Sequence, residues 1–294
     1  MPELPEVETI TATLRDRLVG GRLARVETFR ADVRFPLTLL DDPPLAGRRI
    51  LDVRRRARYI VIELEGLEAV VIHLGMTGSL RTVPSSTPRN KHEHVVFHLE
   101  NGMTLRYDDP RRFGFLLRCP LDAPGSEPKA LAELGVEPLT VAFSGPFLRR
   151  AAHGSPRRIK TLLMDNKVVV GVGNIYANEA LFAVGLHPDT PAKLVPPAKL
   201  DELVHTVKAI LRKAIAAGGT TISDYKDADG KEGKFQLELN VYGKDGQPCP
   251  ICASTIVRAV TAGRGTFHCP QCQKPEVRSQ ESGVRIKAGR GKAE

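Results

Sequence analysis

Long hydrophobic runs are missing from this 294-residue sequence, since none approaches the roughly 18 residues that a membrane-spanning helix needs. The acidic, proline-containing amino terminus also lacks the features of a secretory signal peptide. Internal repeats are not evident. These absences favour a cytosolic, cytoplasmic protein with no membrane partner.

Cysteine is scarce, with five residues in the whole chain. Cys119 stands alone and is most simply a buried apolar residue, whereas the other four lie close together near the C-terminus. This uneven placement argues against a disulfide framework and indicates a metal site.

What is present in quantity is apolar content and positive charge. Hydrophobic residues make up 41% of the chain, which is enough for real cores, and the length suggests two domains. The formal net charge is +9 and the pI is about 9.4. This excess favours a polyanionic partner, most simply nucleic acid, although a basic surface can also serve solubility alone.

Short alternating segments with turn signals between them occupy the first 135 residues. Asn101-Gly102 is typical of a two-residue hairpin turn. The pattern predicts a β-sandwich or barrel in this part of the chain. The expected strands are 22–29, 50–53, 59–63, 69–73, 79–83, 94–99, 103–107 and 114–118.

From about Val136 the pattern becomes helical, after an expected linker over 136–150. Residues 218–235 are polar and glycine-bearing, so they form either a functional loop or a partly disordered one. Residues 275–294 are rich in Gly, Arg, Lys and Ser, which predicts a disordered basic tail. The expected helices are 147–152, 159–164, 175–184 and 197–217.

The first nine residues offer chemistry. Removal of the initiator Met would leave Pro2 with a free secondary amine beside Glu3, and an α-amino group has a pKa of about 7.7 to 8.0. Such an amine can attack an electrophilic carbon and form a Schiff base. An ordinary amphipathic helix with an acidic first turn is the plainer interpretation. Its hydrophobic face would be Val7, Ile10, Leu14 and Leu18.

A metal site is predicted by two Cys-x2-Cys pairs separated by sixteen residues. Four thiolates at this spacing suit tetrahedral Zn2+, and no coordination position is left open, so one structural zinc ion is expected. Segments 255–260 and 265–268 alternate like two strands, with Arg264 at the expected hairpin tip. The ligands would be Cys249, Cys252, Cys269 and Cys272.

Two weaker patterns are compatible with phosphate binding. Gly171-Val172-Gly173 precedes a predicted helix, where exposed backbone N–H groups suit an anion, although a tight inter-helix turn would have the same sequence. Basic residues cluster at 54–58, 111–112 and 157–160. Such runs are usually solvated faces, but they could equally neutralise DNA phosphates.

Taken together, these motifs resemble one family closely, the bacterial formamidopyrimidine-DNA glycosylases of the Fpg/Nei group. The similarity covers residues 1 to 274 in the family's order. It is carried by MPELPEVET at 1–9, IHLGMTG at 72–78, DPRRFG at 109–114, MDNKVVVGVGNIYA at 164–177, GGTT at 218–221 and the four-cysteine finger.

The resemblance implies an α+β fold in several parts. These are an N-terminal β-sandwich catalytic domain with an N-terminal helix (1–135), the linker (136–150) and a helical helix-two-turn-helix domain (151–238). A C-terminal four-cysteine zinc finger (239–274) and the basic tail (275–294) would follow. The loop at 218–235 matches the one that folds over the extruded base.

The implied activity is that of a monomeric, bifunctional DNA glycosylase and lyase that needs no diffusible cofactor and acts on damaged double-stranded DNA. Pro2 would attack C1′ of the damaged nucleotide while Glu3 acts as general acid. The resulting iminium would allow β- and δ-elimination at 8-oxoguanine and formamidopyrimidine sites, with Arg264 as the acid of the δ step. Glu6 and Glu179 would support Pro2 and the glycine turn.

Contacts with DNA are also implied by the resemblance. An extruded base leaves a gap, and an apolar wedge is one means of filling it. The gap-filling residues map onto Met76, Arg111 and Phe113, and the further DNA contacts onto His73, His92, Lys160, Asn174 and Tyr242.

One position departs from the family pattern. Arg58 stands where the family usually has a lysine that donates the proton for β-elimination, and a guanidinium, whose pKa is far above that of a lysine, is a poor proton donor. We expect base release to survive, with the lyase rate or lesion preference altered.

Three alternatives remain at this level. An endonuclease VIII-like enzyme for oxidised pyrimidines is possible, although Leu4 and the Met76, Arg111 and Phe113 set favour the purine-directed branch. A non-catalytic zinc-finger protein that recognises damaged DNA is the second, and an RNA-binding protein is the third. A retained Pro2-Glu3 pair argues against a protein without catalysis.

Overall fold

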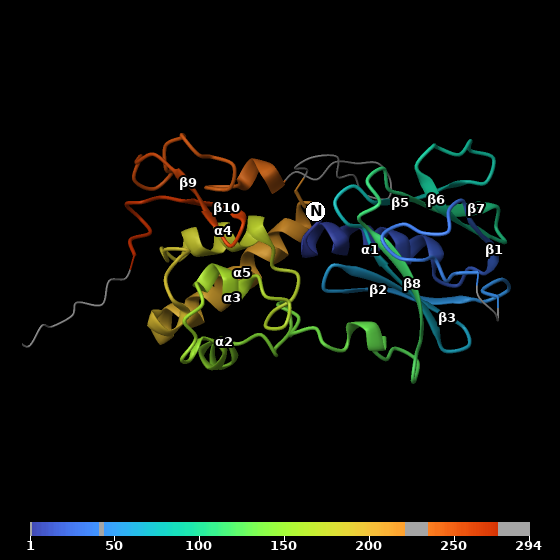
Figure 1. Ribbon diagram of the computed structural model, residues 1–294, viewed down its shortest axis with the longest axis horizontal. Coiled ribbons are helices and arrows are strands. Elements are labelled where there is room, and N and C mark those ends of the chain that lie inside the picture. Colours follow the sequence, from blue (N-terminus) through green and yellow to red (C-terminus); the bar gives the residue numbers. More distant parts are fainter. Residues whose placement is uncertain (1, 41–43, 221–234, 276–294) are drawn as a thin grey trace, which may run out of the picture.

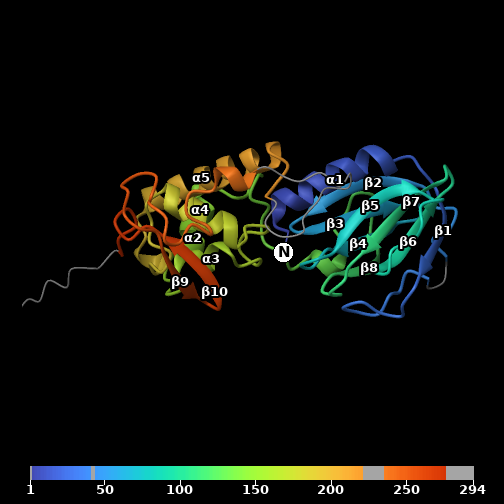
Figure 2. The same cartoon turned by 90° about the horizontal axis from the view of Figure 1, so that it is seen from above.

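The computed structural model describes residues 2–40, 44–220 and 235–275 and consists of two halves side by side (Figure 1). A β-rich half contains the first 120 residues, and a helical half with a small C-terminal hairpin contains most of the rest. The N-terminal end of α1 (Leu4–Leu18) lies where the two halves meet (Figures 1 and 2).

Within the described residues, the β-rich half has two four-stranded antiparallel sheets, ordered β1-β6-β7-β5 and β2-β3-β4-β8. β-branched and aromatic residues in alternation favour these strands. The predicted sandwich is confirmed. The strands are β1 (Leu23–Thr28), β2 (Ile50–Arg56), β3 (Tyr59–Leu64), β4 (Glu68–His73), β5 (Ser79–Pro84), β6 (Glu93–Leu99), β7 (Met103–Asp108) and β8 (Phe115–Pro120).

Helix α1 belongs to both halves. Its apolar stripe, which includes Val7, Ile10 and Leu14, is buried in the core between the two sheets. Its first residue, Leu4, is buried instead in the core of the helical half. The amino-terminal end of the chain is therefore fixed by apolar contacts at the junction of the two halves. Burying each large apolar side chain there stabilises the fold by about 1.5–3 kcal/mol.

The helical half packs around buried α4, whose residues from Ile175 to Phe182 are all buried. α2 begins at Gly145 with Ser144 as N-cap, so a helix starts inside the segment expected to be a linker. The helices are α2 (Gly145–Ala152), α3 (Ile159–Leu163), α4 (Asn174–Ala183) and α5 (Pro197–Ala216), with short 3-10 turns at Lys129–Leu131, Ala192–Leu194 and Phe235–Glu238.

A two-stranded antiparallel hairpin follows, formed by β9 (Val257–Thr261) and β10 (Arg264–His268). Arg264 is the first residue of β10, directly after the turn, close to its expected place at the tip. The hairpin has its own small core, in which Phe182 of α4 and Phe267 pack together with Cys269. Most of the expected lesion loop (221–234) and of the basic tail (276–294) lies outside the described residues.

Candidate active site

Glu3 lies at the junction of α1 and α4. The side chain is 4% exposed, and its Oε1 accepts a hydrogen bond from the backbone amide of Ile175 at 3.0 Å. This amide belongs to the first turn of α4, where a helix carries partial positive charge. Pro2 is half-buried directly before Glu3. The structure thus places a carboxyl group and the predicted nucleophile together at a helix N-terminus.

The other carboxyl oxygen of Glu3, Oε2, is buried without a hydrogen-bond partner among the described residues. Burial raises the pKa of Glu3 to about 6, and the charge of Arg58 partly opposes this rise. A carboxyl group with this pKa exchanges protons readily near neutral pH, which is what general acid catalysis requires. The free oxygen leaves one position where a substrate atom can receive the proton.

The glycine turn before α4 allows this close approach. A Cβ at Gly173 would lie 2.1 Å from the Glu3 carboxyl carbon, and Gly171 has a positive φ of +74° with Leu4 packed against it. Only glycine fits both positions. The buried turn therefore holds the carboxyl group of Glu3 and the side chain of Leu4 close to its backbone.

Glu6 fixes the same region from one turn along α1. Its Oε2 accepts the backbone amide of Glu3 at 2.8 Å, and its Oε1 accepts the hydroxyl of Tyr176 at 2.6 Å. The amide and hydroxyl of Thr220 also donate to Oε1, at 2.8 and 2.9 Å. The carboxylate thus links α1, α4 and the start of the 218–235 segment, consistent with the supporting role expected for Glu6.

Arg58 follows Ala57, which has a positive φ of 55°, at the turn between β2 and β3. Its side chain is buried, and its Nε has no hydrogen-bond partner in the described part of the chain. Burial lowers the pKa of Arg58, while the charge of Glu3 raises it and that of Arg264 lowers it. The guanidinium is therefore electrostatically coupled to both predicted catalytic groups.

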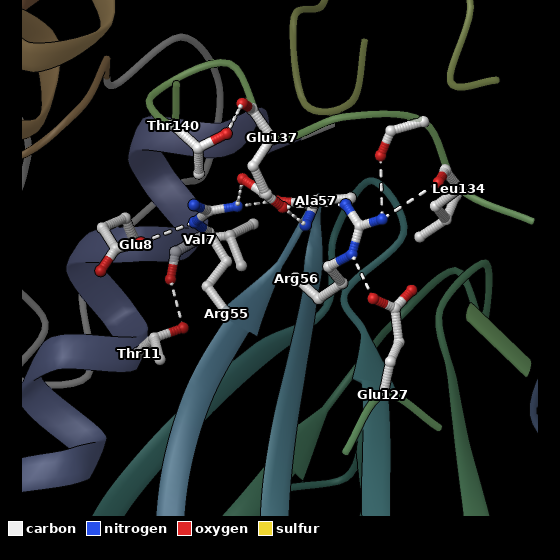
Figure 3. A network of polar contacts seen from close by, with 11 residues as sticks. Val7, Glu8, Thr11, Arg55, Arg56, Ala57, Glu127, Leu134, Glu137 and Thr140 are labelled. Atoms are coloured by element: carbon white, nitrogen blue, oxygen red, sulfur yellow. Dashed lines mark hydrogen bonds and ion pairs between the residues drawn. The ribbon is translucent and has the colours of Figure 1, made fainter. Parts of the chain in front are cut away.

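Arg55 and Arg56, in the basic run at 54–58, form ion pairs within the protein. The sequence had suggested either a solvated face or a phosphate-binding one. Arg55 and Arg56 have side chains only 9% and 12% exposed, and both pair with the Glu137 carboxylate, at 2.8 and 3.1 Å. The backbone amide of Ala57 donates to the same carboxylate at 2.6 Å (Figure 3). A further ion pair joins Arg55 to Glu8. These arginines bind the hairpin that carries Arg58 to the segment between the domains; they are not a solvated or phosphate-binding face.

The predicted gap-filling residues lie on two adjacent loops. Met76 is 50% exposed and Phe113 is 45% exposed, so neither is a core residue. The guanidinium of Arg111 stacks over the Phe113 ring, 4.6 Å from its centroid. Hydrogen bonds from Thr77 to Asp109 and from the Arg111 amide to Thr77 hold the two loops together, and all three predicted side chains are exposed on them.

Asp109 holds these two loops and was not singled out from the sequence. It is fully buried and accepts hydrogen bonds from the Thr77 hydroxyl at 2.6 Å, the Gly114 amide at 2.9 Å and the Tyr107 hydroxyl at 3.0 Å. Its position directly before Pro110 in the DPRRFG motif was the available signal. A buried carboxylate there fixes the backbone on both sides of the exposed wedge.

His73, a predicted DNA contact, lies close enough to Arg58 to feel its charge. Its Nδ1 accepts the Gly75 amide at 3.1 Å, and its ring stacks on Phe115 with centroids 5.3 Å apart. Burial lowers the pKa of His73 to about 4, with the charge of Arg58 acting in the same direction. The imidazole is thus neutral at pH 7 and offers its Nε2–H to an acceptor such as a phosphate oxygen.

The remaining predicted site residues, which are Arg264 and four of the DNA contacts, lie at various depths. Arg264 is exposed, whereas His92, Asn174 and Tyr242 are half-buried. Lys160 was predicted to contact DNA, but its side chain is buried and bonded within the protein. It is 1% exposed, and its Nζ donates to the Gly265 carbonyl at 3.0 Å and the Thr266 hydroxyl at 2.7 Å. Its observed contacts hold the strand that begins with Arg264.

Glu179 supports the Tyr242 segment. Its carboxylate accepts the backbone amides of Asn240, Val241 and Tyr242 at 2.9, 3.0 and 2.8 Å. The Tyr242 ring packs edge-on against Phe267, with centroids 5.0 Å apart. Glu179 therefore positions a predicted DNA contact, and its described contacts lie away from the glycine turn that the sequence had paired with it.

The four clustered cysteines meet in space, with all Sγ atoms within 4.8 Å of one another. The closest pairs, Cys252 with Cys269 and with Cys272, are both 3.5 Å apart. Tetrahedral zinc with Zn–S bonds of about 2.3 Å requires sulfur separations of about 3.8 Å. The residues therefore fit one structural zinc ion, and His268 is not among the clustered ligands.

No helix in the described ranges is long and apolar enough to cross a membrane. Three family models match the chain. They are the formamidopyrimidine-DNA glycosylase N-terminal domain over residues 1–116, the formamidopyrimidine-DNA glycosylase H2TH domain over 134–226, and the zinc finger found in FPG and IleRS over 246–275.

Similar proteins cover nearly the whole chain. The formamidopyrimidine-DNA glycosylase of Laribacter hongkongensis is 45% identical, over 93% of this chain and 100% of that protein. The crystal structure of the MutM (FPG) protein from Thermus thermophilus has a TM-score of 0.82 at 41% identity, covering 93% and 99% of the two chains. The Lactococcus lactis Fpg complex with DNA containing N7-benzyl-Fapy-dG has a TM-score of 0.83 at 33% identity, covering 93% and 100%.

Proposed function

Because this chain belongs to the formamidopyrimidine-DNA glycosylase family, we propose that it is a base-excision repair enzyme acting on damaged double-stranded DNA. The proposed substrates are oxidised and ring-opened purines, namely 8-oxoguanine and formamidopyrimidines. The proposed activity combines base release with strand cleavage at the resulting abasic site. We place the enzyme in the cytoplasm as a monomer.

One observation carries the chemistry. Glu3 has a buried carboxyl group with one oxygen fixed by the Ile175 amide and the other without a partner among the described residues, directly after Pro2. A purely structural carboxylate in a buried place would have both oxygens hydrogen-bonded. The free oxygen and the pKa of about 6 support a role as general acid next to an N-terminal nucleophile.

In the proposed reaction the Pro2 nitrogen forms a bond to C1′ of the extruded nucleotide as the bond from C1′ to the damaged base breaks. The base leaves with the bonding electron pair and takes up one proton, and the Pro2 nitrogen loses one proton. Glu3 donates a proton to the sugar ring oxygen, which opens the ring and leaves an iminium. The iminium acidifies the C2′ hydrogen, so proton loss there expels the 3′ phosphate. A second elimination expels the 5′ phosphate, and water then releases Pro2.

Strand cleavage would differ from base release in its dependence on Arg58. A guanidinium stays protonated, so it can attract a phosphate but cannot readily supply a proton. The buried charge of Arg58, coupled to Glu3 and Arg264, supports an anion-binding role. We therefore propose that base release is efficient and that β-elimination is the slower step.

The exposed set of Met76, Arg111 and Phe113 supports DNA as the partner. Extrusion of a base costs a few kcal/mol, and an inserted apolar wedge stacked with an arginine offsets this cost by filling the gap. The net charge of +9 adds non-specific attraction to phosphates.

A panel of duplexes under single-turnover conditions tests the function. Lesions would be 8-oxoguanine, a formamidopyrimidine, an oxidised pyrimidine and a pre-formed abasic site, each in deoxyribonucleotide duplexes, with a ribonucleotide duplex as comparison. We expect fastest base release from the two purine lesions and none from RNA. Preferred release of the pyrimidine would favour an endonuclease VIII-like enzyme, and binding without release from any duplex would favour a non-catalytic damage sensor.

A further inference from the structure

Helix α4 contacts two separate parts of the proposed active site. At its N-terminal end the amide of Ile175 binds Glu3. Asn178 lies one turn further along α4, is 1% exposed and faces β10. The helix α4 and the strand β10 lie side by side (Figures 1 and 2). One rigid, buried helix thus joins the carboxyl group of Glu3 to the strand that begins with Arg264.

The carboxamide of Asn178 uses both of its ends. Its Oδ1 accepts the backbone amide of Phe267 at 2.9 Å, and its Nδ2 donates to the carbonyl of Asn174 at 2.6 Å. The side chain of Asn174 in turn donates to the carbonyl of Gly265 at 2.9 Å. Two amides spaced i and i+4 on one helix face therefore hold β10 at alternate residues, directly after Arg264.

The direction of the Arg264 side chain depends on the backbone of β10. Its side chain is exposed, and no hydrogen bond or ion pair of its guanidinium is seen among the residues described. Its direction is therefore set by the course of the strand behind it. A shift of β10 relative to α4 would move the guanidinium relative to Glu3 by a similar distance.

We propose that Asn178 is a positioning residue for Arg264: it fixes β10 on α4 so that the guanidinium stands at a set distance from Glu3, where it can attract the phosphate that the second elimination expels. This inference rests on the proposed function, because the role given to Arg264 in the second elimination exists only if the chain cleaves DNA. Asn178 itself touches neither DNA nor the reacting atoms.

Other contacts keep the hairpin in place when Asn178 is changed. Lys160 binds Gly265 and Thr266, and on the neighbouring strand the Thr261 hydroxyl donates to Asp189 at 2.7 Å. Loss of the Asn178 amide should therefore displace β10 slightly without releasing the zinc finger. Thr261→Val offers a matched control, since it also removes one hydrogen bond, here a part-buried one, between the hairpin and the helical half.

The test uses full-length protein and a duplex with a pre-formed abasic site. Borohydride trapping measures Schiff-base formation, gel analysis separates β- from δ-elimination ends, and native mass spectrometry counts zinc. For Asn178→Ala we expect trapping and zinc to be unchanged. The ratio of δ to β product should fall at least about tenfold, because a displacement near 1 Å can cost on the order of 100-fold.

Asn178→Asp keeps an acceptor for the Phe267 amide and should restore much of the δ product. Thr261→Val should leave the product ratio as in the wild type. Provided that the wild type forms both products, two results would overturn this inference but not the proposed function. One is a δ-to-β product ratio that is unchanged in Asn178→Ala, and the other is an equal fall of that ratio in Asn178→Ala and Thr261→Val. A wild-type protein that neither traps nor cuts would overturn the proposed function together with it.

Discussion

Glu137 accepts a hydrogen bond from the backbone amide of Ala57 at 2.6 Å, although the two residues are 80 positions apart. The same carboxylate pairs with Arg55 and Arg56, so the hairpin that carries Arg58 is attached to the segment between the two halves. A single acidic residue thereby holds the backbone directly before Arg58, whose charge belongs to the proposed active site.

Glu137→Gln should destabilise the protein by about 3 kcal/mol, because it leaves two buried guanidinium groups without their shared counter-charge. Urea unfolding would measure the change. Glu127→Gln is the matched control, since Glu127 pairs with the same Arg56 but is 37% exposed, and it should cost about 1 kcal/mol or less. An equal loss of unfolding free energy in the two variants would mean that Glu137 stabilises the protein no more than the exposed Glu127 does.

The Glu3 carboxyl should give stability a distinct dependence on pH. Burial raises its pKa from 4.5 to about 6, so the folded chain binds more protons than the unfolded chain between these values. The protonated Glu3 carboxyl therefore contributes its full share of the unfolding free energy below pH 4.5. This share is lost as the pH rises through 6 and the buried group ionises. By pH 7 the loss is about 2 kcal/mol, since one pKa unit corresponds to about 1.4 kcal/mol.

Glu3→Gln has no such titration. The difference in unfolding free energy between this variant and the wild type should therefore change by that amount between pH 4.5 and 7. A constant difference across this range would show that Glu3 has an ordinary pKa.

Phe113→Ala should separate stability from recognition. The ring is 45% exposed, so its loss should change the unfolding free energy by no more than about 0.5–1 kcal/mol. Affinity for a lesion-containing duplex should fall about tenfold relative to undamaged duplex, because the gap left by the extruded base is no longer filled. Val141→Ala, at a side chain 93% exposed, is the control and should leave both quantities unchanged. An equal loss of affinity for both duplexes would point to a plain phosphate contact.

Removal of zinc should affect the hairpin first. Native mass spectrometry should find one zinc ion per chain, and a strong chelator or Cys269→Ser should remove it, because four thiolates supply the whole site. We expect loss of DNA binding, since Arg264 is carried by the hairpin that the cysteines close. Full binding by metal-free protein would contradict this role.

Local pattern was sufficient for much of the fold. The apolar spacing from Val7 to Leu18 predicted a helix, and α1 spans Leu4–Leu18. The Cys-x2-Cys pairs predicted a cluster that the structure forms. These features depend on near neighbours or on side chains with few alternative uses, which is why the sequence alone reveals them.

Pairings between distant residues were not predictable in this way. The basic run at 54–58 could have faced solvent or DNA, and only the fold brings Arg55 to Glu137, 82 positions later. Likewise Asn178 meets Phe267 across 89 positions. Charge and hydrogen-bonding capacity are visible in a sequence, but which partner satisfies them depends on tertiary packing.

The most direct test of the catalytic proposal is borohydride trapping on a duplex with 8-oxoguanine opposite cytosine, followed by intact-mass analysis and identification of the modified peptide. If the catalytic proposal holds, a covalent complex forms through the nitrogen of Pro2 in protein that has lost Met1. Correctly processed protein that binds this duplex, yet yields neither adduct nor free base from it or from oxidised-pyrimidine and abasic duplexes, would contradict it.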